Sequence, residues 1–291
     1  MYYVIMDLEW DNVFVKKIRG YINEIIEIGA VLVDDDLNFI DDFTCLVKPI
    51  SGRKLTSQVK RLTHITNEEI RHAGLPFHEA IKAFRAWLPP GDTVFMSWGS
   101  GDLRALLDNY FYYSNAETVP FIKKYANLQN YCQPFTAPDT SNQIGLVNAA
   151  EVLGIDVEKY QAHRARDDSY IAYECLKKCY DADRLPKYIK TCDKGFYKRL
   201  RYKAVTVTDI HNPRIDRHLM TCHCDICGNQ MRLCGDWKSG STGFKALFGC
   251  PACNIFKRCT IKFVELADGM DIKISYRNAY EINGNENNAK E

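Results

Sequence analysis

The chain has 291 residues, of which 46% are apolar and 26% are charged, and its formal net charge at neutral pH is +1. This is the composition of an ordinary soluble globular protein with room for one α/β domain and a smaller module. No stretch reaches the roughly 20 apolar residues that a membrane span needs. The first residues run directly into an apolar segment without a signal-peptide pattern, so we expect a cytoplasmic location and no membrane partner.

The charge is distributed unevenly along the chain. Residues 1–185 carry 20 basic against 26 acidic side chains, residues 186–262 carry 15 against 5, and residues 263–291 carry 3 against 6. The middle block, with a net charge of +10, is therefore the part expected to hold a phosphate backbone.

A buried strand is predicted at residues 2–6, which form a nearly continuous apolar run. Because side chains alternate along a strand, Asp7 and Glu9 share one face while Leu8 points into the core. Two buried carboxylates are costly unless a cation neutralises them, and Mg²⁺ and Mn²⁺ prefer such oxygen ligands. The alternative interpretation is an acidic strand end exposed to solvent.

Further strands are predicted at residues 24–33 and 39–48, and Thr66 with Glu69 forms a capping box that opens a short helix. An amphipathic helix is expected at residues 76–88.

A second carboxylate follows the apolar strand predicted at residues 93–97. Asp102 opens a helix whose apolar side carries Leu103, Leu106, Leu107 and Tyr110. A carboxylate at a helix start is either a metal ligand or a cap that favours the helix dipole, and the motif alone leaves both open.

A later helix is expected from a cap at Ser141 to Leu153, with Gly154 ending it.

The third block combines His163 with Asp168. Asp168 begins a helix that ends near residue 182, and His163 lies in the loop that leads into it. The alternative is a solvated histidine beside an acidic cap. Three blocks in this order favour a site for two divalent metals with a histidine base.

Residues 186–203 form a basic segment in which Lys187, Lys190, Lys194 and Lys198 recur at helical spacing among aromatic residues. Such a helix suits single-stranded nucleic acid. A solvated helix that joins two domains is the equally open alternative.

Seven of the twelve cysteines lie between residues 222 and 259. The pairs Cys224/Cys227 and Cys250/Cys253 are CxxC knuckles 22 residues apart, which predicts a zinc ribbon with one structural Zn²⁺. Redox dithiols are the alternative, and the exact ligand set stays open because other donors lie nearby: Cys222, His223, Cys234 and Cys259. We expect the ribbon to bind nucleic acid or a partner protein through nearby Lys, Arg and Phe side chains.

The pattern of residues 261–276 predicts a hairpin that turns at Asp268 and Gly269. The end of the chain is predicted to be a disordered polar tail.

The chain resembles the DEDDh 3′→5′ exonucleases (RNase T and proofreading-exonuclease-like) over roughly residues 1–182. The motifs are DLEW at 7–10, EIIEIGAVLVD at 24–34, LTHIT at 62–66, WGSGD at 98–102 and HRARDD at 163–168. They are most similar to the Eri-type 3′-exonuclease branch, which includes the bacterial sporulation-inhibitor KapD type. Gly101 departs from the bulkier residue common in the family at this position, and Arg164 places the chain in the histidine branch.

The resemblance implies an α/β fold, an RNase H-like mixed β-sheet flanked by helices, followed here by a small C-terminal zinc-ribbon module. It also implies catalysis by two Mg²⁺ or Mn²⁺ ions about 3.5 to 4 Å apart. Asp7 would bridge them, Glu9 and Asp168 would complete one site, and Asp102 would act through water or the second metal. His163 would take a proton from the attacking water, releasing nucleoside 5′-monophosphates.

Four residues are expected to contact substrate: Trp10 and Phe14, on a loop that reaches Gly20, and Lys194 and Lys198 in the basic segment. For the two aromatic residues, stacking on a base and packing of the loop remain equal alternatives. Single-stranded RNA is favoured over DNA on the Eri-type likeness. The rival hypotheses are a DNA 3′-exonuclease and a binding protein that uses the nuclease fold as a platform.

The expected organisation is an exonuclease domain at 1–185, a basic helical linker at 186–218, a zinc ribbon at 219–279 and a disordered polar tail at 280–291.

Overall fold

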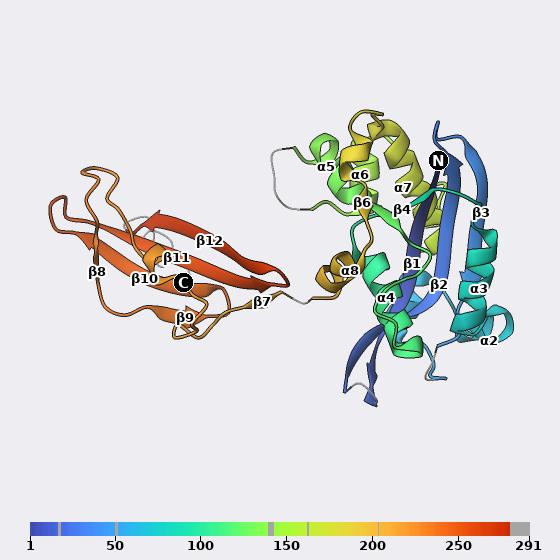
Figure 1. The fold of residues 1–291 in the computed structure, drawn as a ribbon, viewed down its shortest axis with the longest axis horizontal. Helices are drawn as coiled ribbons and strands as arrows, with labels where there is room; N and C mark the ends of the chain where they lie inside the picture. The colour runs from blue at the N-terminus through green and yellow to red at the C-terminus, as the bar shows by residue number, and fades with distance from the viewer. Residues whose placement is uncertain (17–18, 50–51, 139–142, 162, 203, 280–291) are drawn as a thin grey trace, which may run out of the picture. The chain divides into compact units, whose positions relative to one another are not determined.

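The computed structural model describes residues 1–16, 19–49, 52–138, 143–161, 163–202 and 204–279. The chain divides into two compact units, Met1–Arg201 and Tyr202–Glu291 (Figure 1). The expected tail at 280–291 and the expected helix cap at Ser141 lie outside the described residues. None of the helices in the described part of the chain is both long and apolar enough to cross a membrane.

The first unit is built on a mixed six-stranded sheet with the order β3-β2-β1-β4-β5-β6. The strands are β1 (Tyr2–Val15), β2 (Gly20–Asp34), β3 (Phe39–Leu46), β4 (Thr93–Ser97), β5 (Lys124–Asn127) and β6 (Lys190–Thr191). The β1–β2, β2–β3 and β5–β6 pairs are antiparallel, whereas β1–β4 and β4–β5 are parallel. The predicted RNase H-like mixed sheet is confirmed.

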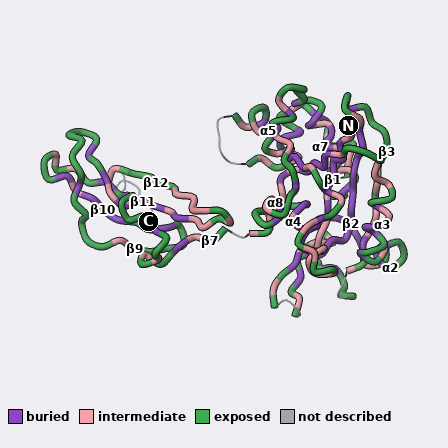
Figure 2. The backbone as a smooth tube through the Cα atoms, in the orientation of Figure 1, coloured by how far each residue is buried: buried purple, intermediate pink, exposed green. Residues whose placement is uncertain are grey.

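Alternate residues of β1 enter two separate apolar cores. Val4, Met6 and Leu8 pack with α3 and α4, whereas Tyr3 and Ile5 pack with α5 and α7. Figure 2 shows the centre of β1 and β2 as buried. The helices are α1 (Ser57–Thr63), α2 (Asn67–Ala73), α3 (Phe77–Trp87), α4 (Gly101–Ser114), α5 (Leu128–Thr136), α6 (Leu146–Val152), α7 (Ala165–Cys179) and α8 (Lys194–Arg201).

The segment after the first acidic motif is a strand, so the expected loop from Trp10 to Gly20 is wrong. β1 continues to Val15 and pairs with β2 as far as Gly20, and a register shift between Glu9 and Trp10 marks where the pairing changes. The pairing persists because Asp11, Val13 and Ile22 are buried in this part of the hairpin. Figure 1 shows the hairpin projecting past the rest of the first unit.

The basic segment does not form the single helix expected over residues 186–203. It is divided into a 3₁₀ turn (Leu185–Tyr188), strand β6 and helix α8. The helix restarts at Asp193, whose side chain accepts a hydrogen bond from the Phe196 amide at 2.7 Å. Lys187 and Lys190 therefore do not share a helical face with Lys194 and Lys198.

Helix α8 belongs to the first unit and packs into one of its cores. Its Tyr197 side chain is buried, and the hydroxyl donates to the carbonyl oxygens of Val119 at 3.1 Å and Ile122 at 2.9 Å. The segment expected as a linker at 186–218 is thus shared between the two units, which divide at Arg201.

The second unit is a β-structure around one apolar core. Its strands are β7 (Val205–Thr206), β8 (Arg232–Leu233), β9 (Lys238–Gly240), β10 (Gly243–Cys250), β11 (Ile255–Leu266) and β12 (Gly269–Asn278), and a 3₁₀ turn spans Arg217–Leu219. The main order is β12-β11-β10-β8, with β7 paired to β11 and β9 to β10. The hairpin predicted at 261–276 is present in a longer form, and it turns between Leu266 and Gly269 as expected.

Candidate active site and zinc site

The first part of the site is the carboxyl half of β1. Asp7 and Glu9 lie two residues apart and are half-buried, while Leu8 between them is 3% exposed and belongs to the core under α4. Asp7 continues the alternation of Tyr3 and Ile5, which face α7. The strand therefore presents both carboxylates on one face, as the sequence predicts.

Asp102 joins this face from the start of α4. Its Oδ1 accepts a hydrogen bond from the backbone amide of Leu8 at 3.1 Å, and the side chain is only 4% exposed. The segment that leads into α4 is fixed behind it, because the buried hydroxyls of Ser97 and Tyr125 both donate to the carbonyl oxygen of Gly99. The carboxylate thus sits beside the two acids of β1.

Helix α7 and the turn before it supply the third part. Asp168 is 8% exposed, and its Oδ2 accepts a hydrogen bond from the backbone amide of His163 at 3.1 Å. His163 adopts a left-handed backbone conformation (φ 61°), and its side chain is exposed. Ligand atoms of Glu9, His163 and Asp168 all lie within 4.8 Å of one another. The structure therefore brings the histidine and carboxylates from both ends of the first unit together.

A buried ion pair that sequence analysis missed holds this turn on the sheet. Glu27 of β2 is 1% exposed, and its carboxylate accepts from Arg164 Nη2 at 2.7 Å, from Arg164 Nε at 3.1 Å and from the Ala165 amide at 3.0 Å. Gly29 on the same strand makes the approach possible, because a Cβ there would lie 2.1 Å from the Ala165 carbonyl carbon. The sequence signal for this pair was Glu27 itself, an acid inside an otherwise apolar strand. A carboxylate buried in this way requires a charged or hydrogen-bonding partner.

Burial is the main reason that the four carboxylates resist ionisation, and neighbouring acids add to it. Burial, followed by the charges of Asp102 and Asp168, raises the pKa of Asp7 well above its ordinary value. Burial, together with neighbouring acids, raises the pKa of Glu9 to about 8 and that of Asp168 to about 6. Burial also raises the pKa of Asp102 to about 7 although the Leu8 amide opposes the shift. Such a surplus of buried oxygen ligands fits hard divalent cations.

The comparison with known families agrees with this geometry. The exonuclease family RNase_T matches residues 4–176, which is more than half of the chain. The chain belongs to the RNase_T exonuclease family. The resemblance to DEDDh 3′-exonucleases seen in the sequence is thereby confirmed, and no curated protein matches the sequence.

Several solved structures share the fold of this exonuclease. One shows "3'-end specific recognition of histone mRNA stem-loop by 3'-exonuclease" (23% identity, 60% of this chain, 62% of that chain, TM-score 0.50). Another is cell-death related nuclease 4 (20% identity, 65% of each chain, TM-score 0.51). A third is the nuclease domain of 3'hExo, a DEDDh family member, bound to rAMP (24% identity, 64% of this chain, 92% of that chain, TM-score 0.52). The exonuclease thus spans less than two thirds of the length of the first two.

The expected substrate contacts lie at different places on the exonuclease unit. We call Asp7, Glu9, Asp102 and Asp168 the acid cluster. The Trp10 ring borders this cluster, because its Cη2 would lie 3.5 Å from a Cβ on Gly101, the residue before Asp102. Phe14 is 43% exposed and stacks edge-on with Tyr21 on the opposite strand, with ring centroids 5.4 Å apart. At about 3.3 Å per strand residue, Phe14 lies on the order of 16 Å along β1 from Glu9. Trp10 thus packs at the rim, whereas Phe14 is displayed on the hairpin.

Lys194 and Lys198 are exposed on α8. This helix meets α4 where the Arg201 guanidinium lies 3.5 Å from the centre of the Phe111 ring. Phe111 is nine residues along α4 from Asp102, on the order of 14 Å at 1.5 Å per residue. If these lysines bind substrate, they would therefore contact nucleotides that lie away from the 3′ end that is cleaved.

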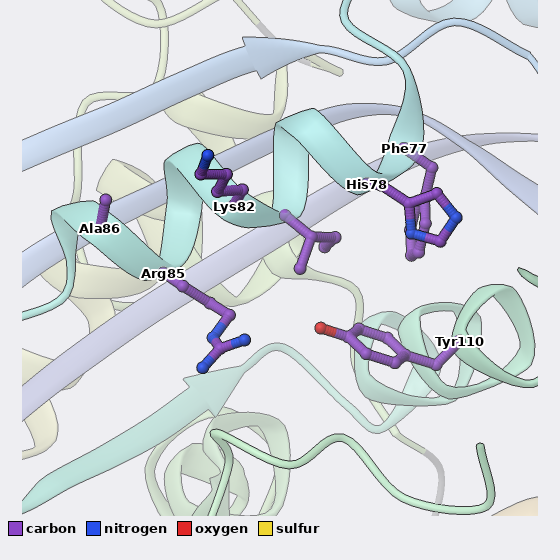
Figure 3. A pocket seen from close by; sticks show the side chains of 7 residues that line it. Phe77, His78, Lys82, Arg85, Ala86 and Tyr110 are labelled. Atoms are coloured by element: carbon purple, nitrogen blue, oxygen red, sulfur yellow. The ribbon is translucent and has the colours of Figure 1, made fainter. Parts of the chain in front are cut away.

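A hollow of about 370 Å³ between α3 and α4 is chemically different from the acid cluster. Figure 3 shows the Arg85 guanidinium and the Tyr110 hydroxyl directed into it, with His78 and Phe77 at one end. It is lined by cationic and aromatic side chains without a carboxylate. This hollow lacks the ligands of a divalent-metal site.

The second unit brings together the two predicted knuckles. Sulfur atoms of Cys224, Cys227, Cys250 and Cys253 all lie within 4.8 Å of one another, and those of Cys227 and Cys250 are 3.6 Å apart. Backbone amides of Cys227 and Ile226 point at the Cys224 sulfur and lower its pKa to about 7. Four thiols in this arrangement fit one tetrahedral Zn²⁺.

The other donors near the knuckles have different surroundings. Cys222 and Cys259 are buried in the apolar core of the unit, and the Cys222 sulfur contacts the Met231 sulfur at 3.6 Å. Cys234 is exposed, and its sulfur would lie 3.1 Å from a Cβ on Gly249. His223 forms a bridge with Gln230. Within the described residues, the four knuckle thiols are the only cysteine group close enough to share a metal.

Proposed function

We propose that this exonuclease removes nucleoside 5′-monophosphates from the 3′ ends of single-stranded RNA, using two Mg²⁺ or Mn²⁺ ions. The observation that carries the proposal is the convergence of Asp7, Glu9, Asp102, Asp168 and His163. Burial and the neighbouring acids both raise the pKa values of these carboxylates when no cation is bound. Two divalent cations held by these carboxylates would neutralise the cluster and stabilise the charge that develops on the phosphodiester.

The residues of the chain have separate tasks in this reaction. His163 accepts the proton of the attacking water, because its exposed imidazole lies within 4.8 Å of Glu9 and Asp168. The water oxygen forms a bond to phosphorus, the bond from phosphorus to the 3′ oxygen breaks, and that oxygen takes a proton to leave as a 3′ hydroxyl. Asp7, Glu9, Asp102 and Asp168 supply oxygen ligands, and Asp102 also fixes the backbone of β1.

Substrate contacts follow from the positions of the exposed groups. Trp10 would contact the terminal nucleotide beside Gly101, and Phe14 would stack on a base further along the strand. Lys194 and Lys198 would hold phosphates on α8. RNA is favoured because similar structures are described with a histone mRNA stem-loop and with rAMP.

One Zn²⁺ at Cys224, Cys227, Cys250 and Cys253 would stabilise the second unit. The domain pattern we propose keeps the exonuclease at 1–185 and the zinc ribbon at 219–279, and a cytoplasmic location remains a prediction from the sequence.

The experiment follows the degradation of 5′-labelled single-stranded RNA and of DNA of the same sequence with Mg²⁺ or Mn²⁺. We expect a ladder that shortens from the 3′ end, faster on RNA. Asp7→Ala should abolish it, while Glu79→Ala, an exposed acid in the first turn of α3, should leave it unchanged. A faster ladder on DNA would favour a DNA 3′-exonuclease. Absence of a ladder from folded protein on either strand would favour a binding protein with a nuclease fold.

A further inference from the structure

The sheet of the second unit has one face packed on the core and one face in solvent. On β10, Phe244, Ala246 and Phe248 are buried, whereas Lys245 is exposed and Leu247 is half-buried between them. The same alternation continues on β11. Side chains on the solvent side of neighbouring strands therefore lie next to one another.

This solvent side carries pairs of like charge directly opposite one another. Strand register places Lys245 opposite Lys238, Arg258 opposite Arg277 and Lys262 opposite Lys273. We call these six residues the basic face. Like charges directly opposite in a sheet are destabilising. Three such pairs on one face carry a repulsion that a bound polyanion would neutralise, so the arrangement fits a binding surface for a polyanion.

The acids near the basic face are few. Asp271 shares the face at its far end, opposite Val264, and Asp236 lies in the segment before β9. Within the described part of the chain, no ion pair joins a carboxylate to Lys238, Lys245 or Arg258. Lys257, on the opposite side of β11, differs because it is buried and paired with Asp225 of the first knuckle.

Three members of the basic face line a hollow of about 590 Å³. Lys238, Lys245 and Arg258 border it together with Leu247 and the segment 234–236, which adds the carboxylate of Asp236. This volume lies in the range of small-molecule sites, so it can take a nucleotide. The three cationic groups reach it from three different strands, β9, β10 and β11.

An aromatic side chain lies on the same side. Phe256 is 43% exposed and stands opposite Gly249, where a Cβ would lie 3.0 Å from the ring. The ring is therefore displayed beside the basic face, unlike Phe244 and Phe248, which are buried in the core. Aromatic rings next to cationic side chains bind single strands by stacking on bases while the cations hold phosphates.

We propose that the basic face, with Phe256, is a second binding surface for single-stranded RNA, separate from the acid cluster. The choice of RNA rests on the proposed function. Lys238, Lys245 and Arg258 bind backbone phosphates at the hollow, and Phe256 stacks on a base. This surface holds the strand by contacts that do not depend on sequence.

The test measures affinity without cleavage, so its outcome does not depend on whether the exonuclease assignment is correct. Full-length, zinc-loaded protein with Asp7→Ala is titrated into a 5′-fluorescein-labelled, unstructured RNA, without Mg²⁺ or Mn²⁺, between 50 and 200 mM salt. Fluorescence anisotropy gives the Kd and the slope of log K against log salt. The variants are K238Q/K245Q/R258Q, F256A and F256W.

Loss of three phosphate contacts should weaken binding at least tenfold at the lower salt and reduce the slope by about 2, since each contact to a single strand contributes about 0.7. F256A should weaken binding by roughly 5- to 100-fold with an unchanged slope, and F256W should restore it. The control K82Q/R85Q/K178Q removes the same charge from α3 and α7 and should bind like the parent.

The proposal is overturned if the two ribbon variants bind like the parent or lose no more affinity than the control, while zinc content and circular dichroism show that they are folded. Tighter binding of DNA of the same sequence would overturn the assignment to RNA.

Discussion

The carboxylate of Asp102 accepts a hydrogen bond from the backbone amide of Leu8 at 3.1 Å, although the two residues are 94 positions apart. The bond joins the start of α4 to the middle of β1, between the two acids of that strand. Asp102 therefore has a structural contact in addition to its proposed metal contact, and the two can be separated by substitution.

Asp102→Asn should keep the hydrogen bond, because an amide oxygen can accept it, and should lose the charge. We expect the free energy of unfolding to be unchanged or higher and the exonuclease activity to fall at least a hundredfold. Asp102→Ala should lose the activity and also about 1 to 3 kcal/mol of stability, since the buried Leu8 amide is left without its acceptor. Urea unfolding of both variants checks the difference; equal stability of Asn and Ala variants would contradict it.

The Glu27–Arg164 pair predicts a strong effect at a position outside the acid cluster. Arg164→Ala should cost about 3 kcal/mol, because it leaves the buried Glu27 carboxylate without its charged partner. Glu27→Gln combined with Arg164→Met should recover part of this loss. Thermal and urea unfolding measure the effect. If the stability lost by the double variant equals the sum of the losses in the two single variants, the interaction between Glu27 and Arg164 is contradicted.

Stability of the metal-free protein should fall as the pH rises from about 4 to about 8. Folding raises the pKa of Glu9 from 4.5 to about 8 and that of Asp168 from 3.8 to about 6, so the folded state binds protons more tightly than the unfolded state. The stabilisation is fully present below the unfolded values and is lost as the pH passes through the folded values. Melting temperatures of zinc-loaded protein that has been dialysed free of Mg²⁺ and Mn²⁺ check this.

Divalent cations provide the control for the pH effect. Mg²⁺ or Mn²⁺ should raise the melting temperature more at pH 8 than at pH 6, and Asp7→Asn should flatten the metal-free profile. A profile that is flat for the parent protein, or that rises with pH, would show that the carboxylates are not held together in solution.

The zinc ligands can be separated from the neighbouring donors. Cys224→Ser and Cys253→Ser should lose most of the bound zinc, whereas Cys222→Ala and Cys234→Ser should keep one zinc per chain. The reason is that only the four knuckle thiols converge among the described cysteines. Zinc content after gel filtration measures the result, and zinc loss in Cys234→Ser would indicate a shifted ligand set.

Phe14 tests the role of the projecting hairpin. Because its ring is exposed and contacts Tyr21 alone among the aromatic rings of the described residues, Phe14→Ala should raise KM about tenfold on long strands and leave kcat close to the parent value. Phe39→Ala, another exposed aromatic on β3, serves as a matched control. An equal change in both variants would argue against a substrate contact.

Local sequence patterns were sufficient for much of the fold. The alternation around Leu8 predicted which way the first two acids face, and the capping box of Thr66 and Glu69 is formed as expected. Both features depend on residues within a few positions of one another, which periodicity describes.

Features set by distant partners could not be predicted in this way. Asp11 extends β1 past the acidic motif because its carboxylate accepts from the Thr56 amide at 2.8 Å and the Thr56 hydroxyl at 2.9 Å. The basic segment is interrupted because Lys190 and Thr191 pair with β5. Glu27 meets Arg164 from 137 positions away. In each case a tertiary contact decides the local structure.

The acid cluster also has a consequence for the order of synthesis. Gly29 lets the start of α7 rest on β2, so Asp168 reaches Asp7 only when the chain has been made beyond its first half. A nascent chain that ends before His163 carries Asp7, Glu9 and Asp102 but neither Asp168 nor the histidine. Such a chain has an incomplete acid cluster, so the exonuclease site is assembled only after α7 has been made.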